Sequence, residues 1–241
     1  EQKGVSTDNL DTILDHYVNR NIMNFFIAAA MPMDIPEDAL RVYCLDSGAI
    51  FILNHFSGSD CVTWMTADSK KSIRLVVKYL TTVRFYLSMT ETKRNELHYF
   101  RPLADFNTGA RQTRFSADFQ IKSGFTERNF ILEVIRKEDF PIDWLKKVDT
   151  QIEPFISQKR WERYYGPEPV FILLAENKDV ALEASDIFYR RLQSDQFRVT
   201  TDEEIAKGMA KAKFFKYVPA TEEEHQKLVP VKAGIFLPST K

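Results

Sequence analysis

Residues Val170-Phe171-Ile172-Leu173-Leu174 form an uninterrupted apolar run. A run without polar positions is typical of a strand that is covered on both faces, because neither side of it faces water. After this run, the expected elements are a helix at 180–192, a strand at 197–199, a helix at 202–211 and a strand at 214–218. Such alternation predicts an α/β fold, with a mixed sheet and helices on both of its faces.

The segment before this run predicts a helix, three strands and a second helix. The first helix is expected at 69–89, where apolar residues recur at helical spacing. Its apolar stripe consists of Ile73, Val76, Val77, Leu80, Val83 and Leu87. Strands are expected at 97–103, 113–121 and 129–136, and Pro141 begins the second helix. In the strand at 113–121, apolar and polar residues alternate with the period of two of a β-strand.

Residues 1–67 are expected to form a small α+β module, and residues 68–241 an α/β domain. The module begins with helical sequence from Asp8 to Met31, which the polar residues 19–21 divide into two helices. Pro32 ends the second of them, because proline disfavours helix at the residue before it. The strands of the antiparallel meander that follows are expected at 41–45, 49–56 and 61–65.

Charge is distributed unevenly along a chain whose net charge is −1. Residues 1–67 hold nine acidic and three basic side chains, whereas residues 68–94 hold two acidic and seven basic ones. Any surface for a polyanion is therefore local. No apolar run reaches 18 residues, so we expect no membrane partner. Two cysteines are too few for a disulfide framework, and we expect a cytoplasmic protein.

Two carboxylates lie in strand sequence, Asp118 on the polar face of its alternating strand and Glu133 within an apolar run. A carboxylate in such a strand is unfavourable unless it is paired, hydrogen-bonded or bound to a metal. On neighbouring strands the two could hold Mg²⁺, which prefers oxygen ligands and can activate water against a phosphodiester. The structural alternative places Asp118 in solvent at a sheet end and pairs Glu133 with Arg114 or Arg136.

This order of elements, with an acid on the second and third strands, resembles the PD-(D/E)XK nuclease-like superfamily. More narrowly, the sequences at 115–118 and 130–136, followed by Lys146-Lys147, resemble the replication-relaxation proteins of bacterial plasmids and conjugative elements. The resemblance covers residues 69–218. It implies a helix-strand-strand-strand-helix-strand core, often preceded by a winged-helix part, and a role in plasmid replication or mobilisation.

Two positions depart from the family patterns, and at the first of them Ala117 stands where a proline would precede the aspartate. The superfamily has a lysine two residues after the glutamate, and Ile135 stands there in this chain. Without that lysine, the charge that develops on the attacked phosphate lacks its stabilising cation. Lys122, on the strand of Asp118, and Lys147, on the following helix, are candidates to replace it. We expect a core without catalysis, and an active enzyme would combine Asp118 and Glu133 as Mg²⁺ ligands with one of these lysines.

Three groups of basic residues are candidate contacts for nucleic acid. They are Lys70, Lys71, Arg74 and Lys78 on one helix face, Arg111 and Arg114 before the strand of Asp118, and Lys159, Arg160 and Arg163 among aromatic residues. Lysine and arginine can bind phosphates while aromatic rings stack on unpaired bases. In the structural alternative these charges are simply solvated, and Trp161 and Tyr165 pack beneath the sheet.

Three function classes remain open from the sequence. The first is a DNA-associated accessory protein of a bacterial mobile element, with replication or transfer proteins as further partners and no certain cofactor. Its acidic residues 1–67 favour contacts with protein, including a second copy of the chain. The second is a Mg²⁺-dependent endonuclease. The third is an interaction scaffold without nucleic acid, whose binding would not weaken with salt as DNA binding does.

Overall fold

The computed structural model describes residues 7–20, 23–27, 41–45, 72–93, 95–107, 112–194, 196–221 and 224–231. The chain divides into two compact units, Glu1–Val76 and Val77–Lys241. The predicted boundary between residues 67 and 68 lies outside the described residues. Each unit has its own secondary structure and is considered separately.

The first unit contains the helix α1 (Thr7–Asn19) and the strands β1 (Met23–Ile27) and β2 (Arg41–Leu45). The two strands pair antiparallel, with Phe25 opposite Tyr43. The predicted strand at 41–45 is confirmed. The prediction of a second helix from residue 22 was wrong, because the bulky residues of β1 favour extended backbone beside a partner strand. The predicted strands at 49–56 and 61–65 and the helix end at Pro32 lie outside the described residues.

Seven described strands form the sheet of the second unit, in the order β11-β10-β9-β8-β7-β6-β3. Their bounds are β3 Leu97–Pro102, β6 Ala117–Ser123, β7 Thr126–Ile135, β8 Val170–Ala175, β9 Phe197–Thr201, β10 Phe215–Val218 and β11 Lys227–Pro230. Strands β7, β8 and β9 are parallel, and each of the remaining pairs is antiparallel. The prediction of an α/β fold with a mixed sheet is therefore confirmed.

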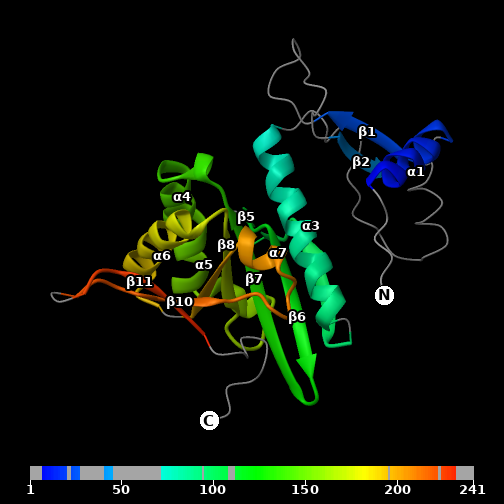
Figure 1. The fold of residues 1–241 in the computed structure, drawn as a ribbon. Helices are drawn as coiled ribbons and strands as arrows, with labels where there is room; N and C mark the ends of the chain where they lie inside the picture. Colours follow the sequence, from blue (N-terminus) through cyan, green and yellow to red (C-terminus); the bar gives the residue numbers. More distant parts are fainter. Residues whose placement is uncertain are drawn as a thin grey trace. The chain divides into compact units, whose positions relative to one another are not determined.

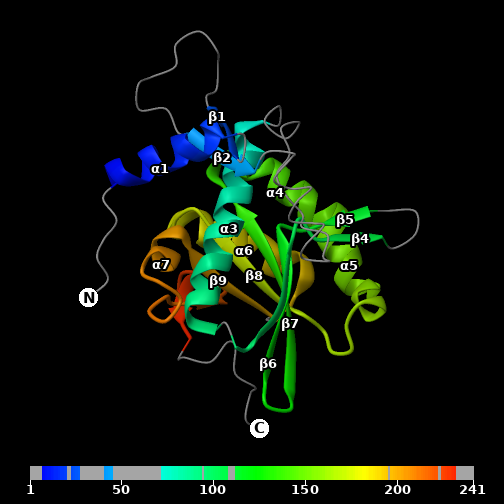
Figure 2. The same ribbon diagram turned by 90° about the vertical axis from the view of Figure 1, so that its right-hand side faces the viewer.

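Helices cover both faces of this sheet (Figures 1 and 2). One face carries α3 (Ile73–Lys93) and α7 (Asp202–Ala206). The other carries α4 (Ile142–Lys147), α5 (Glu153–Ser157) and α6 (Lys178–Leu192). A π-helical turn joins α4 to α5, so the two form one interrupted helix after Pro141, where the sequence predicted a single helix.

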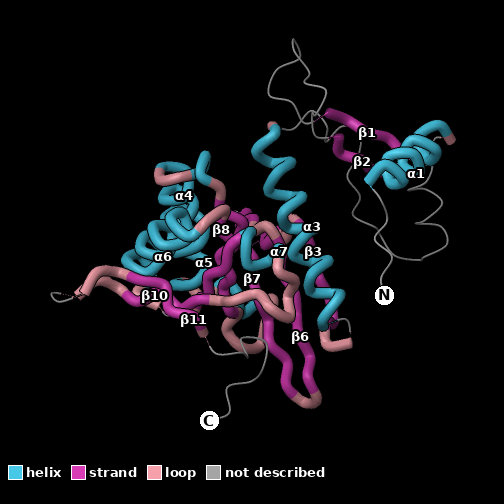
Figure 3. The backbone as a smooth tube through the Cα atoms, viewed as in Figure 1, coloured by secondary structure: helices cyan, strands magenta, loops and turns pink. Residues whose placement is uncertain are grey.

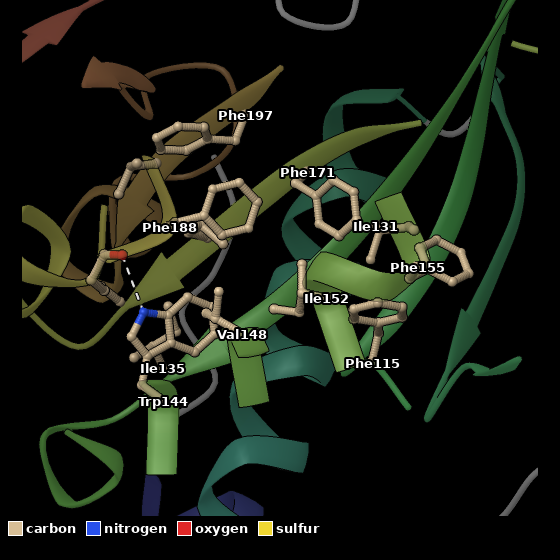
Figure 4. Close-up of a cluster of buried hydrophobic side chains, with 14 of the residues drawn as sticks. Phe115, Ile131, Ile135, Trp144, Val148, Ile152, Phe155, Phe171, Phe188 and Phe197 are labelled. Atoms are coloured by element: carbon tan, nitrogen blue, oxygen red, sulfur yellow. Dashed lines mark hydrogen bonds between the residues drawn. The ribbon is translucent and has the colours of Figure 1, made fainter. Parts of the chain in front are cut away.

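The larger apolar core lies between the sheet and the α4–α6 layer, and its aromatic rings pack in series (Figure 4). Phe171 of β8 lies between Phe115 and Phe188, with ring centres 5.7 Å from each. The indole N–H of Trp144 donates to the backbone carbonyl of Ala184, 3.1 Å away, and so joins α4 to α6. Every residue of β8 is buried, which confirms the prediction for the apolar run.

The second core lies beneath α3 and departs from the predicted stripe. Phe85 and Met89 are fully buried against Phe119 and Leu132, whereas Leu87 is half exposed. The predicted apolar stripe was wrong in the later turns of the helix. There the larger side chains of Phe85 and Met89, one helical turn apart, face the sheet instead.

The predicted strand at 113–121 is interrupted. Residues Gln112–Arg114 form β5, which pairs with β4 (Asp105–Asn107) outside the main sheet, and β6 begins only at Ala117. The break turns Phe115 to the α4–α6 face, although Ala117 and Phe119 face α3. No strand was predicted at the position of β11, which pairs with β10 and forms an edge strand of the sheet.

Candidate functional site

Asp118 is fully buried near the start of β6 and is bound by a neighbouring strand. Arg101 stands directly opposite it on β3, and its guanidinium reaches both carboxylate oxygens, Nε to Oδ1 at 2.8 Å and Nη2 to Oδ2 at 2.9 Å. The hydroxyl of Tyr165 donates to Oδ2 at 2.9 Å and that of Tyr99 at 3.3 Å. The alternative that placed Asp118 in solvent was therefore wrong. Both oxygens of the buried Asp118 carboxylate accept hydrogen bonds.

The pKa values of the surrounding groups follow from this arrangement. Burial, and then the charge of Asp118, raises the pKa of Tyr165 and of Tyr99 above the ordinary tyrosine value, so both hydroxyls stay protonated as donors. The hydrogen bond to Asp118 raises the pKa of Arg101. The guanidinium of Arg101 also lies 5.5 Å from the ring centre of Phe106, while 49% of its side chain is exposed.

Glu133 is buried near the end of β7, among apolar residues, and has a different cation. Its Oε1 accepts a hydrogen bond from Lys147 Nζ at 2.6 Å, and its Oε2 accepts one from the backbone N–H of Ser116 at 3.3 Å. The predicted partners are engaged elsewhere, Arg114 with Asp105 and Arg136 with Asp202.

The register of β6 and β7 brings the two acids together. Asp118 is opposite Ile131, and Glu133 lies two residues further along β7, so both side chains emerge on the face that α4–α6 cover. Such diagonal neighbours are about 7–8 Å apart. Lys147 joins them from α4. Lys122 does not, because it lies four residues along β6 from Asp118, about 13 Å away, and pairs with Glu127.

The acids do not fit a magnesium ion in this arrangement. Mg²⁺ requires near-octahedral oxygen coordination, usually by carboxylates that keep room for water. Arg101 occupies both oxygens of Asp118, and Lys147 occupies one oxygen of Glu133. Among the described residues, moreover, no group of three or more His, Cys, Asp or Glu side chains is placed to hold a metal.

Two basic side chains pair with the two acids, and two more adjoin, in sequence, the aromatic residues that lie beside them. Arg101 contacts Phe106 and Lys147 contacts Phe115, and these two rings are 5.6 Å apart. Arg114 precedes Phe115, and Arg163 precedes Tyr164, whose ring lies 4.9 Å from Phe106. We call Arg101, Arg114, Lys147 and Arg163 the basic rim. Two of its members, Arg114 and Arg163, were among the predicted contacts for nucleic acid.

The other predicted contacts lie in varied places. Lys159 and Arg160 lie at the start of the short 3-10 turn that contains Arg163, and Arg160 bonds to Gln158. Trp161 and Tyr165 are buried in the core, as the structural alternative held, so neither ring is open to a base. Arg74 lies in the first turn of α3 and is partly buried. Lys70, Lys71 and Arg111 lie outside the described residues.

Lys78 belongs to a second polar network, on the opposite face of the sheet, where α3 and α7 meet the end of β7. Its ammonium lies 2.5 Å from the buried Asp139. Beside them, the buried guanidinium of Arg136 bonds to Asp202 and to the hydroxyl of Thr81. Its Nε has no hydrogen-bond partner among the described residues. This network attaches α3 and α7 to the sheet.

Sequence reasoning missed Tyr99, Arg101 and, as a ligand of Asp118, Tyr165. The residues of β3 were recognised as a strand, but the contact of Arg101 with Asp118 depends on the register of β3 against β6. A cross-strand pair of opposite charges was the available signal, because directly opposite side chains interact. Tyr165 comes from a segment 47 residues away, which no local pattern could have indicated.

Comparisons of the chain with protein-family models, curated proteins and solved structures find no match. Within the described parts of the chain, every helix is too short or too polar to cross a membrane.

Proposed function

We propose that the second unit is a nuclease-like core that binds DNA without cleaving it, in a cytoplasmic accessory protein of a bacterial mobile element. The observation that carries this proposal is the pairing of Asp118 with Arg101, which occupies the carboxylate that a metal-dependent nuclease would need free. The order α3, β3, β6, β7, α4–α5 and β8 supports the relation to the PD-(D/E)XK core, since it follows the same helix-strand-strand-strand-helix-strand sequence.

The energetics of the site favour the closed arrangement. Removal of one partner from a buried ion pair typically destabilises a protein by about 3–5 kcal/mol, because the other charge is left unpaired. A metal ion that displaced Arg101 would also have to match the two tyrosine hydrogen bonds to Asp118. The acids thus act as fixed anchors, which hold Arg101 and Lys147 in place at the surface.

The basic rim is the proposed DNA surface. Each of Arg101 and Lys147 is oriented by a buried carboxylate, and this pre-organisation reduces the entropy lost when a phosphate binds. Arg114 is 69% exposed and, among the described residues, its guanidinium pairs with Asp105 at the long distance of 3.4 Å, so it can turn toward a phosphate. The first unit is proposed to contact replication or transfer proteins, or a second copy of the chain.

DNA binding can be tested by fluorescence anisotropy with a labelled duplex and a labelled single strand over a series of salt concentrations. The proposal predicts binding that weakens steeply with salt, as phosphate contacts release counterions. The double variant Arg114→Ala/Arg163→Ala is expected to bind about tenfold or more weakly and with a shallower salt dependence. Arg190→Ala, which removes an exposed arginine of α6, is the matched control. Absence of binding by the wild-type protein would contradict the proposal and favour the interaction scaffold.

A second candidate function, a Mg²⁺-dependent endonuclease, is favoured by one observation. Lys147 Nζ lies 2.6 Å from Glu133, so a lysine from α4 accompanies the glutamate although Ile135 stands in the superfamily's lysine position. This candidate requires that Arg101 leave Asp118. Metal-dependent nicking of plasmid DNA would support it.

A further inference from the structure

The β6–β7 hairpin projects from the sheet as a two-stranded ribbon (Figures 1, 2 and 3). Strand β3 pairs with β6 only as far as Ile121, and β8 pairs with β7 only from Phe130 onward. Residues 122–129 therefore extend past both neighbouring strands. The last cross-strand pair is Ser123 with Thr126, and a two-residue turn of Gly124 and Phe125 closes the hairpin.

The stem of this hairpin is polar, and side-chain contacts across its two strands stabilise it. Lys122 pairs with Glu127 across the strands at 2.7 Å, and the Gln120 amide donates to Asn129 at 3.0 Å. The backbone N–H of Lys122 donates to the Glu96 carbonyl at 2.7 Å, which fastens the base of the ribbon. Gly124 has φ +60°, in the left-handed region that favours glycine and that tight hairpin turns require.

Phe125 is fully exposed at the tip of this stem. The other large apolar residues of the hairpin, Ile121 and Phe130 among them, are buried. Among the described residues of the hairpin, Phe125 is thus the one exposed large apolar side chain. Its charged neighbours along the stem are Lys122, Glu127 and Arg128.

We propose that Phe125 inserts between the bases of DNA bound to the basic rim. This inference rests on the proposed DNA binding. Apolar wedges on protein ribbons unstack base steps, and aromatic rings stack on bases of any sequence. A protein pocket or a lipid surface would favour a wider apolar patch, whereas a single exposed ring on a polar stem matches insertion between stacked bases.

The distance between the two contacts suits one nucleic acid segment. Phe125 lies seven residues along the chain from Asp118, a length of about 23 Å in an extended strand. With about 3.4 Å per nucleotide step, this corresponds to roughly seven steps. One short duplex or single strand can therefore reach the rim and the tip together.

The test uses the full chain and DNA of about 20 nucleotides with 2-aminopurine at successive positions. Wild-type protein is expected to raise 2-aminopurine fluorescence at one step, because insertion unstacks the reporter base. Phe125→Ala is expected to abolish this rise and to weaken binding about tenfold, in the range of one base–aromatic stack. Ile142→Ala, which removes another highly exposed apolar side chain, is the control and is expected to bind as wild type does. Thermal melting of each variant checks folding.

The outcomes separate this inference from the proposed function. If wild-type protein binds DNA, the rim variant binds weakly and Phe125→Ala binds normally, the insertion is overturned and the DNA-binding proposal stands. If Phe125→Ala weakens binding but no 2-aminopurine position responds to wild type, Phe125 contacts the DNA without insertion, and the inference is again overturned. If wild-type protein binds no DNA, both proposals fall.

Discussion

The two buried ion-pair networks on opposite faces of the sheet present different charges to solvent. At the first, Asp118 and Glu133 are buried and their partners, Arg101 and Lys147, reach the surface. At the second, one buried residue of each sign pairs with a more exposed residue of the opposite sign, Arg136 with Asp202 and Asp139 with Lys78. The first network therefore displays cations only, which suits a polyanion, whereas the second displays both signs and joins helices to the sheet.

The largest effect is expected for Arg101→Ala. This change leaves the fully buried Asp118 without its cation, and we expect the free energy of unfolding to fall by about 3–5 kcal/mol. Urea denaturation measures the change. Arg190→Ala removes an arginine from an exposed pair with Asp186 and should change stability by less than about 1 kcal/mol. Equal effects of the two substitutions would show that Asp118 does not depend on Arg101.

Tyr165→Phe is expected to have the next largest effect, because it removes a hydrogen bond to a buried carboxylate. The expected loss at neutral pH is about 1.5–3 kcal/mol. The pKa of Tyr165 is raised in the folded protein, so its contribution is fully present below the unfolded value near 10 and is lost as pH rises above it. Urea denaturation at pH 7 to 11 should therefore show the difference between wild type and variant shrinking above about pH 10. A difference that grows there would contradict the assignment.

The different charges that the two networks display predict different effects on DNA binding, which are smaller than the effects on stability described above. Arg114→Ala is expected to weaken DNA binding several-fold and to reduce the slope of log affinity against log salt by about 1, as for one phosphate contact. Lys78→Ala is expected to leave affinity unchanged, because Lys78 lies in the network on the opposite face of the sheet from the basic rim. Anisotropy titrations at several salt concentrations compare the two. A stronger effect of Lys78→Ala would reverse the functional assignment of the networks.

The most local effect is expected for Lys78→Ala, and hydrogen exchange measures it. Loss of the 2.5 Å contact with Asp139 frees the early turns of α3, and we expect faster exchange there than around Phe85 and Met89, which are fully buried. Uniform acceleration along the whole helix would show that α3 is held as one unit instead.

Local sequence patterns predicted the sheet better than they predicted the site. The apolar run of β8 predicts a buried strand without knowledge of its neighbours, and so do the apolar residues around Glu133. Strands of this composition are stable only when both faces are covered. The prediction of a second helix from residue 22 failed because β1 depends on pairing with β2, a contact outside the local window. The stripe on α3 failed because the choice between two adjacent apolar faces is made by packing against the sheet.

The candidate site shows the same limit. Asp118 and Glu133 were recognisable, since carboxylates are conspicuous in apolar strands, and Lys147 was one of two lysines considered. The cation that occupies Asp118 was not recognised, because Arg101 reaches it only through the register of β3, and Tyr165 arrives from a distant turn. Which residues neutralise a buried charge is decided by tertiary contacts.

The most direct test of a DNA-binding core without catalysis is incubation of supercoiled plasmid with the wild-type and Glu133→Gln proteins in Mg²⁺, Mn²⁺ or EDTA. With Arg101 and Lys147 bound to the two acids, we expect the plasmid to remain supercoiled under all three conditions, while its mobility shifts in a salt-sensitive manner. Metal-dependent nicking by the wild-type protein that Glu133→Gln abolishes would contradict this account and establish the endonuclease.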